Sequence, residues 1–176
     1  RLQWIHAVPA EFHARYSARE RHYRYLIRHR AQPSALWARR CHWHKKPLDA
    51  AAMHSAAQAL IGEHDFSAFR AAECQAKSPW RFIRSIDVRE RHGWIAVDIC
   101  GNAFLHHMVR NIVGTLLAVG DGRRSTAWPG EVLASRDRRA AGVTAPAQGL
   151  YFHGVAYPLE YALPAFPPAW IPDGFF

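Results

Sequence analysis

One arginine in apolar surroundings is the side chain most suited to chemistry. Arg110 is the only formally charged residue in segment 103–119, whose apolar residues recur at helical spacing. An arginine in such surroundings generally needs a carboxylate partner. Asp98, Asp87 and Glu73 are candidates within the chain, and an arginine at the exposed edge of the helix would need none. The functional alternative is a guanidinium that pairs with a catalytic carboxylate.

The histidines and cysteines do not form a convincing metal-binding pattern. His106 and His107 precede Arg110 closely, but such pairs are more often surface or hydrogen-bonded histidines than ligands. His42-Trp43-His44 is an H-x-H pattern on an expected strand, with no third ligand at suitable spacing. The sequence also lacks a phosphate-binding loop, a dinucleotide fingerprint and a zinc-hydrolase motif. We therefore expect no metal and no nucleotide cofactor.

The positive charge is concentrated in one stretch of the chain. Residues 13–46 contain ten lysines and arginines and one acid, a balance of +9 that equals the net charge of the whole chain. Within this stretch, residues 17–29 alternate as a strand does, with Tyr23 and Tyr25 among arginines. A solvated sheet edge would also be rich in arginine, but interleaved tyrosines favour a surface that stacks bases and pairs with phosphates. We expect a polyanionic partner such as RNA.

Hydrophobic periodicity and capping residues predict the elements that position these side chains. Asp49 is suited to cap a helix that Gly62 would end, and His92-Gly93 is suited to the turn of a hairpin. The predicted elements, in chain order, are a strand at 17–29, a short strand around 42–44, a helix from 49 to 61, hairpin strands on either side of His92-Gly93, helices at 103–119 and 128–135, and a strand at 150–157. This order predicts an α+β fold.

Composition is that of an ordinary globular protein. The chain has 176 residues, of which 49% are hydrophobic and 21% charged, so it can bury a core without disulfides. We expect one α+β domain over residues 1–157 and an extended, proline-rich tail over 158–176. Segment 103–119 is too short and too polar at its centre to span a membrane. Three widely spaced cysteines fit a reducing cytoplasm, and a start without Met or a signal pattern favours a fragment or processed piece.

Four parts of the chain carry unusual combinations of residues. They are FHARYS (12–17) leading into RHYRY (21–25); DFSAFRA (65–71) with CQAKSP (74–79); NAFLHHMVRNIVG (102–114); and TAPAQGL (144–150). In this order they resemble the tRNA pseudouridine synthase A family, which isomerises uridine in the anticodon arm of tRNA. The resemblance extends over most of the chain.

This resemblance implies a fold and a set of partners. The expected fold is α+β, an antiparallel or mixed sheet with helices packed on one face, as in the C-terminal half of a pseudouridine synthase catalytic domain. The family implies a homodimer, the tRNA anticodon stem-loop as partner, no metal or nucleotide cofactor, and an aspartate nucleophile in a Gly-Arg-Thr-Asp motif. That motif does not occur in this sequence. We therefore expect the chain to supply one wall of an active site and to be inactive in isolation.

The resemblance also assigns roles to individual residues. It implies that Tyr23 packs against the target base and is a candidate to take the proton from its C5. It implies that Arg110 pairs with the catalytic aspartate and that Leu150 lines the pocket. The expected phosphate contacts are Arg15, Arg19, Arg21, Arg24, Arg70 and Lys77. Two other functions remain open: a non-catalytic RNA-binding module on the same scaffold, and a purely structural dimerisation domain, which would leave the basic stretch without a polyanion.

Overall fold

The basic stretch forms the central strand of a six-stranded sheet. The computed structural model describes residues 4–164, and in it β1 (Glu20–His29) pairs antiparallel with β5 (Trp94–Gly101) along one edge. Its other edge pairs antiparallel with β6 (Leu150–Ala156) and then parallel with β2 (His42–His44). The sheet order is β2-β1-β5-β4-β3, with β6 beside β1. The sheet is therefore mixed, as expected.

The predicted hairpin is confirmed. β4 (Trp80–Arg91) and β5 are joined at His92 and Gly93, both of which have positive φ, of 53° and 73°. Two consecutive positive φ angles match the right-handed twist of the flanking strands, and they explain the glycine in the second position. β3 (Gly62–Asp65) completes the sheet by pairing antiparallel with β4.

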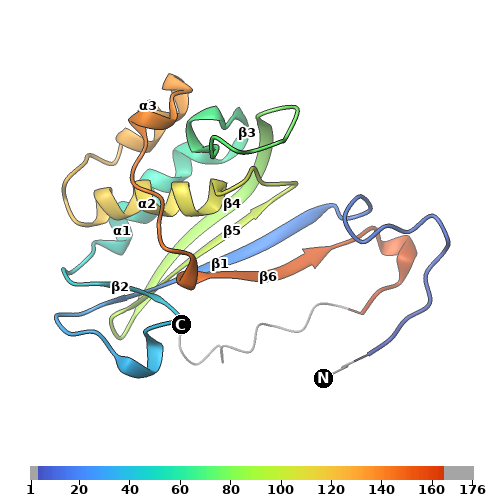
Figure 1. The fold of residues 1–176 in the computed structure, drawn as a ribbon, viewed down its shortest axis with the longest axis horizontal. Coiled ribbons are helices and arrows are strands. Elements are labelled where there is room, and N and C mark those ends of the chain that lie inside the picture. The colour runs from blue at the N-terminus through green and yellow to red at the C-terminus, as the bar shows by residue number, and fades with distance from the viewer. Residues whose placement is uncertain (1–3, 165–176) are drawn as a thin grey trace.

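Three helices cover one face of the sheet (Figure 1). They are α1 (Ala50–Ala57), α2 (Met108–Gly120) and α3 (Trp128–Ser135). Asp49 caps α1 by accepting a hydrogen bond from the Ala52 backbone N–H, as the sequence predicted. Twelve of the thirteen residues of α2 are buried, and Arg110 is the exception. The main core lies between these helices and the apolar side chains of β1, β4 and β5.

Several boundaries differ from the prediction, and one difference matters for the site. The second helix begins at Met108 rather than at 103, because His107 has a left-handed backbone with φ of 59° and interrupts the helix. Residues 103–107 therefore form an irregular segment and a turn that precede α2. The strand expected at 17–29 begins at Glu20, and the helix expected to reach 61 ends at Ala57, followed by a 3₁₀ turn over Gln58–Leu60.

The segment after β6 is not extended throughout. Leu159–Tyr161 forms a 3₁₀ turn, and the rings of Tyr157 and Tyr161 pack at 5.1 and 5.0 Å from that of Phe12. A turn thus lies within the segment that was predicted to be an extended tail, and residues 165–176 lie outside the described residues. Among residues 4–164, no helix combines the length and the apolar character needed to cross a membrane.

Candidate functional site

Arg110 lies in the first turn of α2, half-buried, and has no carboxylate partner within residues 4–164. Its Nε donates a hydrogen bond of 2.6 Å to the carbonyl oxygen of Ala145. In return, the backbone N–H of Ala145 donates a hydrogen bond of 3.1 Å to the carbonyl oxygen of Arg110. Asp98, a candidate partner, is held by two other arginines, and Glu73 faces His106 and His107. None of the candidate ion pairs of Arg110 within the chain is therefore formed among the described residues.

Tyr23 lies on the helix-facing side of β1, between two other aromatic rings. Phe104, from the turn before α2, meets it edge-on at a centroid distance of 5.2 Å, and Phe152 of β6 meets it at 5.3 Å. Phe152 is 53% exposed and is the direct register partner of Tyr23. Burial raises the pKa of Tyr23, and the nearby Arg21 offsets only part of this. The phenol is therefore protonated at neutral pH.

Tyr23, Arg110 and Leu150 line one cavity of about 380 Å³, together with Phe104 and His107. Three segments distant in the sequence thus meet there: β1, the start of α2 and the start of β6. The pKa of His107 is lowered by burial and by the neighbouring charges of His106 and Arg110. Arg110 is accordingly the stable cation of this cavity at neutral pH.

The segment between α3 and β6 is fixed against both α2 and β1. The hydroxyl of the fully buried Tyr25 donates 2.7 Å to the carbonyl oxygen of Pro146. A Cβ on Gly149 would lie 2.6 Å from the Tyr25 ring, and one on Gly114 would lie 1.8 Å from the Val143 carbonyl oxygen. Only glycine permits these close approaches, which hold the Ala145 carbonyl against Arg110.

A second, basic cavity of about 490 Å³ adjoins the first and shares Tyr23, Phe104 and His106 with it. Arg15 and Arg21 line it, and both were expected to contact phosphate. Arg21 donates to the carbonyl oxygens of Ala18 and Asn102, at 3.0 and 2.6 Å, so part of its guanidinium fixes the backbone.

The other expected phosphate contacts lie in different environments. Arg19 and Lys77 are exposed. Arg70 is half-buried, and its Nη2 donates 2.9 Å to the carbonyl oxygen of Ala76. Arg24 is buried on the opposite face of the sheet, where it binds Asp98 through two hydrogen bonds of 2.6 and 3.1 Å. This geometry speaks against Arg24 as a phosphate contact, because its guanidinium is already held by a carboxylate.

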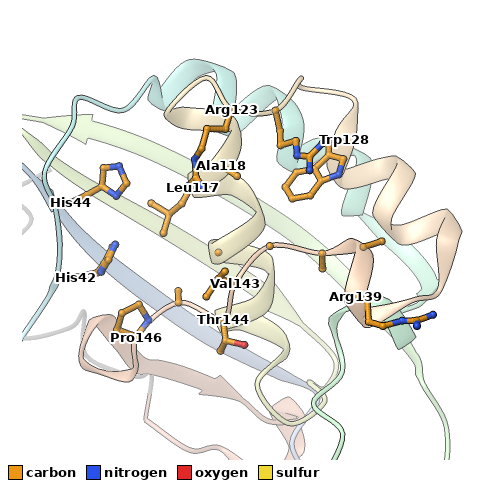
Figure 2. Close-up of a pocket in the computed structure, with 16 residues that line it drawn as sticks. His42, His44, Leu117, Ala118, Arg123, Trp128, Arg139, Val143, Thr144 and Pro146 are labelled. Carbon is orange, nitrogen blue, oxygen red and sulfur yellow. The ribbon is translucent and has the colours of Figure 1, made fainter.

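The largest of the described cavities, about 630 Å³, lies elsewhere and contains none of Tyr23, Arg110 or Leu150. Figure 2 shows His42 and His44 projecting from β2 on one side of it, with Leu117 and Ala118 of α2 and the segment at Val143–Pro146 around the rest. Burial, and to a lesser extent His44, lowers the pKa of His42 to about 4. His42 is therefore neutral at pH 7 and adds no positive charge to this cavity.

A family model described as tRNA pseudouridine synthase matches residues 56–158, more than half of the chain. The chain belongs to the tRNA pseudouridine synthase family. Among curated relatives, a tRNA pseudouridine synthase A of Cronobacter sakazakii is 51% identical over 164 residues, covering 93% of this chain and 60% of that protein. The same-named proteins of Bordetella petrii and Aeromonas hydrophila are 52% and 50% identical, over 92% and 98% of this chain. The chain spans 60–65% of the length of these three relatives.

Sequence reasoning missed two aromatic residues of the site and misplaced a third. Phe104 was within a recognised motif but was expected in a helix, whereas it lies before α2 and meets Tyr23 edge-on. Phe152 follows Leu150 by two residues, so strand alternation alone puts both on the side that faces Tyr23. Tyr25 was read as part of an RNA-facing surface, whereas it is buried and holds Pro146.

Proposed function

We propose that the chain forms the tRNA-binding surface and one pocket wall of a tRNA pseudouridine synthase that acts on the anticodon arm. The observation that carries this proposal is the cavity in which Arg110, without a carboxylate partner in residues 4–164, faces the same space as Tyr23 and Leu150. A guanidinium so placed suits a carboxylate supplied from outside the described chain. The established family supports the same conclusion.

The chemistry is an isomerisation and needs no oxidant or reductant. The bond between C1′ and N1 of uridine breaks, the base turns, a bond forms between C1′ and C5, and the C5 proton is lost while N1 gains one. The base must first leave its stack, which requires an aromatic or apolar wall to receive it. Tyr23, Phe104 and Leu150 supply such a wall, and Arg110 would hold the reacting carboxylate in its ionised form.

The protonated phenol of Tyr23 favours stacking over proton abstraction. A tyrosine can accept the C5 proton only as a phenolate, and burial disfavours that form here. Tyr23→Phe keeps the ring and removes the hydroxyl. Near-normal turnover of this variant would support stacking, and an arrest after cleavage of the glycosidic bond would support a base.

The basic cavity next to this wall is suited to the RNA backbone. Arg15, Arg19, Lys77 and the partly engaged Arg21 and Arg70 are the proposed phosphate contacts, and Arg24 is not among them. Cytoplasmic location and a homodimer are part of the proposal on the strength of the family resemblance.

The decisive experiment uses the protein extended to the full length of its relatives. Arg110→Met keeps side-chain length and removes the charge, so the catalytic carboxylate would lose its partner. We expect kcat for pseudouridine formation to fall at least a hundredfold, about 2.7 kcal/mol, while tRNA affinity changes little. Arg81→Met, which removes a cation from the basic cavity only, is the matched control and should affect binding more than kcat. Full activity of Arg110→Met would show that Arg110 serves structure.

The second candidate is a non-catalytic RNA-binding module, favoured by the concentration of positive charge in residues 13–46. The two candidates differ in the behaviour of the longer protein. The 176-residue chain should bind tRNA without forming pseudouridine under either candidate, whereas only a synthase forms product once the remaining sequence is present.

A further inference from the structure

Three side chains of different chemistry converge on the face of the sheet opposite the helices. Glu20 and His22 lie on β1, and Cys100 is the direct register partner of His22 on β5. The Cys100 Sγ lies 3.5 Å from the Glu20 Oε2 and 3.6 Å from the His22 Nε2, and these two atoms are 3.6 Å apart. Carboxylate oxygen, imidazole nitrogen and sulfur thus form a nearly equilateral triangle.

This triangle has the dimensions of three ligands around a tetrahedral zinc ion. Zinc bonds of about 2.3 Å to sulfur, 2.0–2.1 Å to nitrogen and 2.0–2.2 Å to oxygen, at tetrahedral angles, require ligand atoms roughly 3.4–3.6 Å apart. The three separations in the structure match these values. We propose that Glu20, His22 and Cys100 bind a zinc ion, with solvent as the fourth ligand.

The site adjoins a cavity, and the guanidinium of Arg84 lies beside its three side chains. His22 and Cys100 line a cavity of about 210 Å³ that also includes Arg84. The Arg84 Nη2 lies 3.0 Å from the Glu20 Oε2 and 3.4 Å from the Cys100 Sγ. The Arg84 side chain is 54% exposed, so its guanidinium can turn towards solvent when a metal ion takes its place. Zinc would replace this guanidinium, and the thiol proton would pass to solvent as the Zn–S bond forms.

Among the described residues, one other group could be compared with it, Glu73 with His106 and His107. Its two histidines share one carboxylate oxygen, at 3.5 and 3.9 Å, and Glu73 and His106 are exposed. It contains no thiol, and a thiolate ligand selects zinc over harder cations, which prefer oxygen ligands. The geometry therefore favours the Glu20, His22 and Cys100 site.

A metal ion at this site would join β1 to β5 directly behind Tyr23. Tyr23 follows His22 in β1, and its side chain points to the opposite face of the sheet. The ion would thus stabilise the strand that carries Tyr23 without entering the cavity that contains Arg110. This makes the inference independent of the proposed catalytic function.

Titration of the metal-stripped 176-residue chain with Co²⁺ tests the proposal, because tetrahedral cobalt bound to a thiolate has characteristic charge-transfer absorption. We expect one equivalent to bind with this absorption and one equivalent of Zn²⁺ to displace it. Cys100→Ser should abolish the charge-transfer band, whereas Cys41→Ser, which changes a buried thiol outside the site, should leave it unchanged. Glu73→Gln should also leave it unchanged.

Two further variants separate a metal site from an ion-pair network around Arg84. His22→Gln, at a half-buried position, should weaken binding roughly tenfold or more with the fold retained in circular dichroism. Arg84→Gln removes the competing cation and should tighten binding. A band that survives Cys100→Ser, an absence of charge-transfer absorption with the original chain, or weaker binding by Arg84→Gln would each overturn the proposal.

Discussion

Replacement of Asn111 by leucine should destabilise the fold strongly, because Asn111 joins α2 to two other segments. The side chain is fully buried, and its Nδ2 donates 2.7 Å to the carbonyl oxygen of Phe69. Its Oδ1 accepts hydrogen bonds from the Thr144 hydroxyl at 2.7 Å and from the Arg138 Nη2 at 3.1 Å. Leucine has nearly the same shape and can make none of these bonds.

The expected cost follows from the groups left without Asn111. The Phe69 carbonyl loses a buried donor, at about 1–3 kcal/mol, and Thr144 loses its acceptor, at about 1 kcal/mol. Arg138 keeps Gly142 and Thr144 as acceptors, so its loss is smaller. The total is about 3 kcal/mol, which corresponds to roughly 6–12 °C in Tm for a chain of this length.

Urea and thermal unfolding of the two proteins measure this difference, with Thr144→Val as the matched control. The control deletes one hydroxyl from the same network and should cost only about 1 kcal/mol. A loss below about 1 kcal/mol for Asn111→Leu would refute the reasoning. It would show that the segment over residues 138–145 is held against α2 mainly by packing.

Three other properties of the chain can be measured independently. Gly114→Ala should lower the free energy of unfolding by about 1–3 kcal/mol or more, because the added Cβ would lie 1.8 Å from the Val143 carbonyl oxygen. Gly130→Ala, whose added Cβ would have its nearest neighbour at 3.4 Å, should be neutral in the same unfolding experiments. The pKa of His42 is about 4 in the folded chain and 6.5 in the unfolded chain, so on acidification the unfolded chain binds a proton at His42 first. The free energy of unfolding should therefore fall between pH 6.5 and 4, and His42→Gln should flatten this fall in urea titrations at several pH values. Affinity for tRNA should drop about a hundredfold between roughly 50 and 200 mM salt if about four phosphates are neutralised, and salt-independent binding would contradict the basic surface.

The elements of this fold were largely predictable because their signals are local. The turn at His92-Gly93, the Asp49 cap and the third helix were all placed correctly by residue type and period. The α2 boundary was wrong because nothing in the side-chain pattern distinguishes His107 in a left-handed conformation from a helical histidine. Apolar residues continue across it in both directions, so periodicity could not locate the break.

The environment of each arginine depended on strand pairing, which the sequence did not specify. Alternation placed Arg24 and Tyr23 on opposite faces of β1, but both faces carried cations and apolar residues. The register of β1 with β5 sets Arg24 directly opposite Asp98, and the two side chains form an ion pair that the sequence did not predict. The same register brings His22 to Cys100. Contacts between residues more than seventy positions apart decided both outcomes.

The charge of Arg110 lies at an unfavourable position in α2. This arginine lies in the first turn of α2, which contains no acidic residue, and it is the single residue of that helix that is not buried. A cation at a helix N-terminus opposes the helix dipole and costs about 0.3–1 kcal/mol. The hydrogen bond from the Arg110 Nε to the Ala145 carbonyl oxygen uses one donor of the guanidinium but supplies no negative charge to balance it. A negative charge brought into the cavity would turn the unfavourable arrangement into a favourable one, which is what the proposed catalytic carboxylate would do.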